Sequence, residues 1–269
     1  MQTLQCMDVW GGAEAVDTGV SVPGLDAWVY SRPYEGAVKG GDLHYLSLCS
    51  QGRVARVLLA DVSGHGAGVS GIAGGLYDAM RENINVLDQS EMARRLNDTF
   101  SAAAGAGRFA TAVILSHYEG EVVSVNAGHP APLWRHAEDG RWSRLEPTCP
   151  EAREAATGLP LGVIGGTDYE QFAVRVGAGD AVLIYSDALI EAREGGTGPL
   201  LGVAGLMRLA EGLRATGGAT ERATDAVTLG RRLIEAVDGY RGGEPADDDQ
   251  TLLTLHFHGR GGRLGTDGG

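Results

Sequence analysis

Lysine is almost absent from this sequence: Lys39 is the only one, and the other basic residues are arginines. A Walker-type phosphate-binding loop needs a lysine directly before serine or threonine, whereas glycine follows Lys39. A lysine that forms a Schiff base could only be this same residue. The sequence therefore disfavours both P-loop nucleotide hydrolysis and imine chemistry.

Cysteine and long apolar runs are also scarce. Cys6, Cys49 and Cys149 are odd in number and far apart, which suits neither a disulfide framework nor a zinc knuckle. We expect three ordinary thiols in a reducing compartment. No apolar stretch approaches the roughly 18 residues that a membrane-spanning helix needs, and the N-terminus lacks a basic region followed by an apolar run. These absences predict a soluble, cytoplasmic protein with no membrane partner.

Positive charge is in deficit. The 22 basic residues face 35 acidic ones, which gives a formal net charge of -13. Nucleic acids and anionic membranes bind basic faces, so the composition argues against either partner. A phosphorylated substrate stays compatible with this charge, because a bound divalent metal ion can dominate the local field.

Glycine is abundant, with 43 residues and no collagen-like period. The simplest interpretation of this glycine content is that the chain has many tight turns and therefore many strands. We find no internal repeat and no linker that divides the 269 residues. We expect residues 1–22 to form an N-terminal arm or an edge strand, residues 23–258 to form one domain, and the glycine- and arginine-rich residues 259–269 to be a disordered tail.

Hydrophobic periodicity predicts many short strands and two pairs of helices. Apolar residues at helical spacing predict helices over 66–84 and 88–104, and Asp88 is the predicted cap of the second. The four glycines of the first helix lower its propensity, so we expect it to be buried closely against a sheet or another helix. Further helices are predicted near 203–212 and 221–238. Short strands joined by tight turns favour antiparallel sheets, and we expect strands over 27–30, 43–50, 54–60, 109–116, 122–126, 133–136, 142–145, 172–176, 181–185 and 252–257.

Two aspartates stand at the ends of an expected hairpin. Asp42 begins the first strand, Asp61 ends the second, and a Gln51-Gly52 turn signal lies between them. In a hairpin the start of one strand lies beside the end of the next, so the two carboxylates converge. Carboxylates held close together repel each other unless a proton or a metal ion neutralises them.

Two more strands carry acidic residues at their ends. Asp187 follows the strand 181–185, and the run Asp247-Asp248-Asp249 precedes the last strand. Any one of these could be an ordinary turn aspartate. Four carboxylate positions at four strand ends together favour a site for magnesium or manganese, which prefer oxygen ligands.

Seven short motifs in a fixed order give the chain a resemblance. Together they resemble the bacterial SpoIIE/RsbU branch of the metal-dependent protein phosphatase 2C superfamily, over roughly residues 25–257. The motifs are Gly40-Gly41-Asp42, Asp61-Val-Ser-Gly-His-Gly66, Phe109-Ala-Thr-Ala112, Asn126-Ala-Gly-His-Pro-Ala-Pro132, Gly158-Leu-Pro-Leu-Gly162, Tyr185-Ser-Asp187 with Glu191-Ala-Arg193, and Asp248-Asp-Gln-Thr251.

The resemblance implies an α+β fold in which two antiparallel sheets form a sandwich flanked by helices. It also implies hydrolysis of phosphoserine and phosphothreonine in proteins by two Mn²⁺ or Mg²⁺ ions, with a metal-bridging water as the nucleophile. Asp61 would bridge the ions and the main-chain carbonyl of Val62 would bind one of them. Asp42 would serve the second ion, and Asp187 and Asp248 the first. Asp249 and Thr251 would orient the neighbouring turn.

The resemblance further implies signalling substrates, such as a phosphorylated anti-sigma-factor antagonist. We expect control by a partner or by assembly into a homodimer, relayed through the helices 66–84 and 88–104. Arg108 and Arg193 could bind phosphate, but solvated surface arginines are the simpler interpretation. Histidines hydrogen-bonded within turns are likewise the simpler interpretation of His65 and His129.

Two departures from the family pattern keep alternatives open. Ala188 stands where members usually have glycine, and residues 43–46 lack a commonly present aspartate. The alternatives are a pseudophosphatase that acts as a regulatory binding module and a metal-dependent hydrolase of small phosphate esters. Retention of the four carboxylate positions counts against the pseudophosphatase.

Overall fold

The computed structural model describes residues 1–64, 67–103, 105, 107–147, 157–215 and 225–258. The expected disordered tail over 259–269, and the predictions for His65 and Cys149, lie outside these residues. Within the described part of the chain, every helix is too short or too polar to span a membrane.

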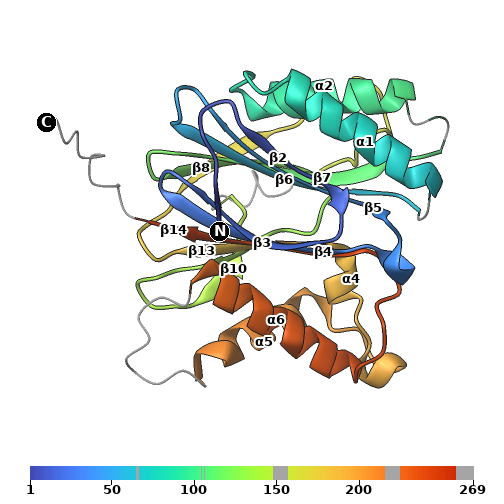
Figure 1. Cartoon of the computed structure of the whole chain (residues 1–269), viewed down its shortest axis with the longest axis vertical. Helices are drawn as coiled ribbons and strands as arrows, with labels where there is room; N and C mark the ends of the chain where they lie inside the picture. Colours follow the sequence, from blue (N-terminus) through green and yellow to red (C-terminus); the bar gives the residue numbers. More distant parts are fainter. Residues whose placement is uncertain (65–66, 104, 106, 148–156, 216–224, 259–269) are drawn as a thin grey trace, which may run out of the picture.

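Two sheets stack face to face, and helices cover both outer faces (Figure 1). This arrangement confirms the predicted α+β sandwich. The first sheet has the order β1 (Gln2–Thr3), β3 (Val16–Val22), β4 (Leu25–Arg32), β14 (Gln250–Phe257), β13 (Ala181–Tyr185), β9 (Leu133–Arg135) and β10 (Trp142–Arg144). The second has the order β11 (Thr157–Gly158), β8 (Glu121–Ala127), β7 (Ala110–Tyr118), β6 (Val54–Val62), β5 (Lys39–Cys49) and β2 (Val9–Glu14), with β12 (Gln171–Arg175) also paired to β8. The pairings are antiparallel except β1 with β3 and β11 with β8.

Each sheet carries its own pair of helices. Helices α1 (Ala67–Glu82) and α2 (Gln89–Ala103) lie on the second sheet, and α5 (Gly202–Ala215) and α6 (Ala226–Arg241) lie on the first (Figure 1). A short helix α4 (Asp187–Ile190) and the 3-10 turns η1 (Tyr34–Gly36) and η2 (Glu194–Gly196) complete the described elements. The predicted cap of α2 is confirmed, because the backbone N–H of Glu91 donates to Asp88 Oδ1 at 3.0 Å.

The core has three layers, and strand β6 shows how one strand serves two of them. Val57 and Leu59 face the layer between the sheets, whereas Leu58 and Ala60 lie under α1 and α2. This alternation follows from the period of two along a strand. A third apolar layer lies between the first sheet and the helices α5 and α6.

Helix α1 is buried along one stripe, but its glycines do not explain the packing. Gly71, Gly74 and Gly75 are exposed, and a Cβ added at any of them would meet open space. The expectation that α1 is buried against a sheet and a second helix is confirmed, but these three glycines are not at the contact. The contact with the sheet and α2 instead comes from apolar side chains of α1, namely Val69, Ala73, Leu76, Ala79 and Met80.

Residues 1–22 contribute strands to both sheets. β2 pairs with β5 at the edge of the second sheet, and β3 pairs with β4 in the first. The backbone at Gly11 has φ +148°, and a Cβ there would lie 2.2 Å from the carbonyl oxygen of His44. Glycine is thus required where β2 approaches β5, which is also why this segment shows little periodicity in the sequence.

Candidate metal centre

Asp42 and Asp61 are register partners in the ladder between β5 and β6, so the predicted hairpin is confirmed. Asp61 lies two residues beyond Leu59, whose side chain packs between the sheets. Side chains two apart on a strand share a face, as do directly opposed residues of an antiparallel pair. Both carboxylates therefore face the layer between the sheets.

The first sheet supplies the other acidic residues to the same end of the sandwich. β13 and β14 are antiparallel neighbours, with Tyr185 opposite Leu252. Asp187 therefore leaves β13 beside the point where Asp248 and Asp249 enter β14. Burial raises the pKa of Asp61, and the charges of Asp187, Asp248 and Asp249 raise it further, to about 7. The fold thus brings carboxylates from both sheets close enough to influence one another.

Asp42 is the most buried of these carboxylates, with 2% of its surface exposed. Among the residues that the structure describes, neither of its carboxylate oxygens has a hydrogen-bond partner of normal geometry. Burial and the nearby charge of Asp61 raise its pKa well above the usual range, although the hydroxyls of Thr251 and Ser186 lie close enough to offset part of this rise. A buried carboxylate without a partner is costly unless a proton or a cation compensates it.

Asp187 is the first residue of α4, and Ser186 occupies the N-cap position. Burial, and then the charges of Glu191 and Asp248, raise the pKa of Asp187. Asp248 is exposed at the rim of the site, and its Oδ1 accepts a hydrogen bond of 2.8 Å from the backbone N–H of Asp249. These two carboxylates therefore form the solvent-facing side of the cluster.

Val62 ends β6 directly after Asp61. A Cβ added at Gly41 would lie 2.9 Å from the carbonyl oxygen of Val62, so this oxygen faces the strand that carries Asp42. The turn beyond it is held by Ser63, whose N–H donates to Phe109 O at 2.9 Å and whose Oγ accepts from Phe109 N at 3.1 Å. The carbonyl of Val62 is thereby fixed at the same end of the sandwich as the carboxylates.

The carboxylate of Asp249 connects the two sheets. It accepts the backbone N–H groups of Tyr34 at 2.6 Å, Gly41 at 2.5 Å and Asp42 at 3.3 Å. A Cβ at Gly40 would lie 2.5 Å from Asp249 Oδ2. Only glycine at position 40 leaves room for the Asp249 carboxylate to make these hydrogen bonds.

Thr251 and Ser186 tie the ends of β13 and β14 together. The backbone N–H of Thr251 donates to Ser186 Oγ at 2.9 Å, and its hydroxyl lies 3.0 Å from the hydroxyl of Ser31. Thr251 is fully buried. The bond between Thr251 and Ser186 links the two strand ends from which Asp248 and Asp187 project.

The chemistry of the donors fits a hard divalent cation. All are oxygens, either carboxylate or main-chain carbonyl, which is the ligand type of magnesium and manganese. The orphaned oxygens of Asp42 and the raised pKa of Asp61 mark where positive charge would be stabilised. Among the described residues, however, no three His, Cys, Asp or Glu side chains converge as a ready-made ligand set. The geometry therefore supports the location of the candidate centre and leaves the assignment of each ligand as a prediction.

His129 is a hydrogen-bonded structural residue, as predicted. It is 3% exposed, and its ring nitrogens lie 2.9 Å from Thr111 Oγ1 and 3.1 Å from Tyr185 O. Burial lowers its pKa to about 4, so the ring is neutral at pH 7. Thr111 is the register partner of Asp61, and the ring thus braces the strands on which the carboxylates lie.

The two arginines considered for phosphate binding differ in their surroundings. Arg193 is exposed, and its Nη1 donates to Gly198 O at 3.3 Å. Arg108 is partly exposed, next to the start of β7. The interpretation of Arg193 as a surface residue is consistent with its position.

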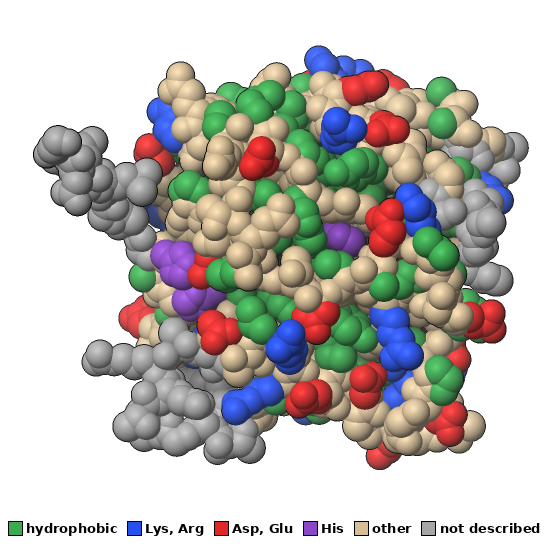
Figure 2. Space-filling model, viewed as in Figure 1, with side chains coloured by type: hydrophobic (Ala, Val, Ile, Leu, Met, Phe, Trp, Pro, Cys, Tyr) green, Lys and Arg blue, Asp and Glu red, His purple; other side chains and the backbone are tan. Residues whose placement is uncertain are grey.

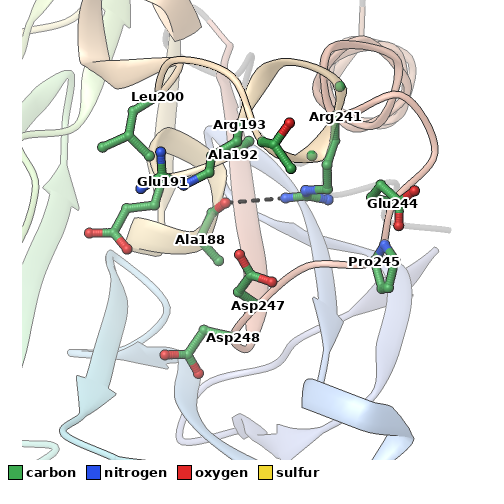
Figure 3. A pocket seen from close by; sticks show the side chains of 13 residues that line it. Ala188, Glu191, Ala192, Arg193, Leu200, Arg241, Glu244, Pro245, Asp247 and Asp248 are labelled. Carbon is green, nitrogen blue, oxygen red and sulfur yellow. Dashed lines mark hydrogen bonds between the residues drawn. The ribbon is translucent and has the colours of Figure 1, made fainter.

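A pocket of about 590 Å³ opens directly beside Asp248 (Figure 3). Sequence reasoning did not identify it, because its walls come from α4, η2 and the segment after α6, which are far apart in the chain. Its lining combines acidic, basic and small apolar residues, including Glu191, Arg193, Leu200, Arg241, Glu244 and Asp247. The pocket places open space next to the candidate metal centre.

The family model described as Stage II sporulation protein E (SpoIIE) matches residues 51–258. This match covers more than half of the chain and contains Asp61, Asp187, Asp248 and Asp249. The segment that carries Asp42 precedes it, so the place of Asp42 in the site rests on the ladder with β6 and on its burial.

Solved structures share the fold. The RsbU and RsbW domains of Rv1364c from Mycobacterium tuberculosis are 25% identical, with a TM-score of 0.72 over 93% of this chain and 64% of that one. The phosphatase domain of SpoIIE from Bacillus subtilis, with a fragment of its regulatory domain, is 14% identical, with a TM-score of 0.66 over 93% and 70% of the two chains. The catalytic domain of the serine/threonine phosphatase PstP, in complex with two manganese ions, is 15% identical, with a TM-score of 0.59 over 87% and 98%. This chain therefore spans less than two thirds of the Mycobacterium chain that it matches.

Proposed function

The chain belongs to the SpoIIE family, in the SpoIIE/RsbU-like branch of the protein phosphatase 2C superfamily, and from this premise we propose that it is a metal-dependent phosphatase of phosphoserine and phosphothreonine in proteins. The observation that carries the proposal is the pair of the buried Asp42 and the half-buried Asp61, which faces acidic residues of the opposite sheet. Buried carboxylates that repel one another have a use in a cation site and little use in a scaffold.

The residues divide into distinct roles in this proposal. Asp61 would bridge two Mn²⁺ or Mg²⁺ ions, and the carbonyl of Val62 would bind one of them. Asp187 and Asp248 would hold the first ion and Asp42 would serve the second. The ions, when bound, would supply Lewis-acid stabilisation of the phosphoryl oxygens and a water of lowered pKa as the nucleophile. Support for two ions comes from the PstP structure, which contains two manganese ions in the same fold.

The protein supplies alignment and charge placement. Asp249 and Thr251 would hold the backbone of the metal-bearing strands in place through the hydrogen bonds described above. His129 is neutral near pH 7 and would brace β7 and β13 without donating a proton. The pocket beside Asp248 would accommodate the polypeptide next to the phosphorylated residue. A phosphoenzyme, and hence a nucleophilic side chain, is unnecessary in this scheme.

We place the phosphatase in bacterial partner-switching signalling. Fold neighbours include a chain that carries RsbU and RsbW domains together and a component of the bacterial stressosome. The proposed substrate is a phosphorylated protein such as an anti-sigma-factor antagonist, in the cytoplasm, where the free thiols of Cys6 and Cys49 would persist. Acidic and basic side chains are intermixed on the face shown in Figure 2, which gives no support to a nucleic-acid or membrane partner. Homodimer formation and a relay through α1 and α2 stay predictions.

A catalytically weak pseudophosphatase is the second candidate. The observation that favours it is Ala188, which is buried directly after Asp187 in α4. The glycine that family members usually have there would be more flexible.

Hydrolysis of para-nitrophenyl phosphate tests the proposal. We expect activity in Mn²⁺, none in EDTA, and a fall of at least 100-fold for Asp248→Asn in Mn²⁺. The matched control is Asp98→Asn, which removes an exposed carboxylate on α2 that forms a surface ion pair with Arg94, and it should behave as the wild type. Folded protein that is inactive in both Mn²⁺ and Mg²⁺ would favour the binding module. Activity on the aryl phosphate with none on any phosphoprotein would favour a hydrolase of small phosphate esters.

A further inference from the structure

Arg241, the last residue of α6, is a buried cation with two fixed partners. Only 5% of its surface is exposed. Its Nη1 donates to Asp238 Oδ1 at 3.0 Å, and its Nη2 donates to the carbonyl oxygen of Ala188 at 3.2 Å. Figure 3 shows the side chain reaching across the pocket from α6 to α4. A buried guanidinium is stable only where its donors are paired, so these two contacts fix where it lies.

The carbonyl that Arg241 holds belongs to the residue after a candidate metal ligand. α4 has only four residues, Asp187–Ile190, and so it has few internal hydrogen bonds to keep it in place. The backbone N–H groups of Ala188 and Asp187 act on the carboxylate of Asp187 in the direction that lowers its pKa, against the larger effect of burial. Arg241 therefore holds, through the carbonyl oxygen of Ala188, the residue that directly follows Asp187.

Arg241 also stands at the start of the segment that leads to the second ligand. α6 ends at Gly242, whose φ of +75° is the left-handed conformation that terminates helices. The chain then continues through Glu244 and Pro245, which line the pocket, to Asp248. The bond between Arg241 and Ala188 therefore joins the two segments that carry Asp187 and Asp248.

We propose that Arg241 is a positioning residue for the metal centre: it holds α4 against the end of α6 so that Asp187 and Asp248 keep the separation that one shared ion requires. The inference rests on the proposed function, because it assumes that these two carboxylates bind an ion. Partners that hold metal ligands in place typically change metal affinity by 10- to 100-fold when they are removed. A role confined to anchoring α6 would instead lower the melting temperature and leave metal affinity unchanged.

The test is Mn²⁺ binding to the full chain by isothermal titration calorimetry, for the wild type, Arg241→Leu, Arg241→Lys and Arg231→Leu. Arg231→Leu is the matched control, because it removes an arginine from the same helix whose pair with Asp17 is on the surface. We expect Arg241→Leu to bind Mn²⁺ 10- to 100-fold more weakly, and the Mn²⁺ concentration for half-maximal hydrolysis of para-nitrophenyl phosphate to rise by a similar factor. A lysine can keep one of the two bonds, so Arg241→Lys should lie between Arg241→Leu and the wild type. Arg231→Leu should match the wild type in both measurements.

The possible results separate this inference from the proposed function. Folded Arg241→Leu with wild-type Mn²⁺ affinity would overturn the positioning role while leaving the phosphatase intact. If Arg241→Leu fails to fold, Arg241→Lys decides: an affinity several-fold weaker than the wild type supports the role, and an unchanged affinity contradicts it. A wild-type chain that binds neither Mn²⁺ nor Mg²⁺ would overturn the proposed function, and this inference with it.

Discussion

Asp42 and Asp61 lie directly opposite each other in the β5–β6 ladder, with both side chains in the layer between the two sheets. Burial is the largest cause of the raised pKa of each, and the charge of Asp61 is the next largest cause for Asp42. The fold therefore holds two carboxyl groups where water stabilises their charges poorly. Such an arrangement lowers stability when both are ionised, and a bound cation would reverse that cost.

The first prediction concerns Asp61 and pH. The pKa of Asp61 is about 7 in the folded chain against an ordinary value of 3.8, so the folded state binds the proton more tightly than the unfolded state. Stability from this group is therefore present at acidic pH and is lost as pH rises from about 4 to 7. Measured by thermal melting in EDTA, Asp61→Asn should gain stability over the wild type as pH rises through this window, by a few kcal/mol at most.

The control for this prediction is Asp78→Asn, at an exposed position of α1. Its difference from the wild type should not vary with pH in the same window. In Mn²⁺ at pH 8, the wild type should regain stability and Asp61→Asn should not. A melting-temperature difference between Asp61→Asn and the wild type that stays constant from pH 4 to pH 8 would show that this carboxyl does not have the raised pKa.

The second prediction concerns two glycines. Gly40→Ala would place a Cβ 2.5 Å from Asp249 Oδ2 and displace the carboxylate that accepts from Gly41 N and Tyr34 N. We expect a loss of about 1–3 kcal/mol in the free energy of unfolding and at least a tenfold loss of phosphatase activity. A Cβ added at Gly74 of α1 would meet open space, so Gly74→Ala should raise the free energy of unfolding by roughly 0.5–1 kcal/mol and leave activity unchanged. Chemical denaturation measures the free energy of unfolding of both variants. An equal change in the two would contradict the role of Gly40 in making room for the Asp249 carboxylate.

The sequence predicts the strand-end carboxylates well because a hairpin and a period of two are local features. The pairing of Asp42 with Asp61 follows from the hairpin, and the convergence with Asp187 and Asp248 follows once β13 and β14 pair. Helix α4 could not be predicted, because four residues carry no helical period. Arg241 was also missed, because an arginine at the end of an amphipathic helix is usually solvated, and only the tertiary structure buries it under Ala188.

The third prediction concerns His44, which is buried in β5 beside Trp10. Its Nδ1 has no hydrogen-bond partner within the described part of the chain, and burial lowers its pKa to about 4. A depressed pKa in the folded state means that stability is fully present above the ordinary value of 6.5 and is lost as pH falls toward 4. Relative to the wild type, His44→Leu should gain up to about 3 kcal/mol between pH 7 and pH 4. The effect of pH on stability has the opposite sign for His44 and for Asp61. Melting curves of His44→Leu and Asp61→Asn, each compared with the wild type at several pH values, therefore distinguish the two residues.

The fourth prediction concerns Arg56, which is fully buried in β6. Its guanidinium donates to the carbonyl oxygens of Ile84 at 3.0 Å and Val86 at 2.5 Å, which lie in the connection between α1 and α2. Arg56→Met would leave both carbonyls unpaired, and we expect a loss of about 2–4 kcal/mol in the free energy of unfolding. Hydrogen exchange should accelerate first in the connection between α1 and α2. The exposed Arg53→Met should change stability by less than about 0.5 kcal/mol, and a similar loss in both variants would contradict the anchoring role of Arg56.

The most direct test of the central claim is anomalous diffraction at the manganese edge from crystals of this chain soaked in MnCl₂. We predict two peaks at the end of the sandwich, both beside Asp61, one shared with Asp187 and Asp248 and the other next to Asp42. Two such peaks would establish that the carboxylates of both sheets form one binuclear centre. Ordered density for all four carboxylates with no manganese peak among them would contradict the account.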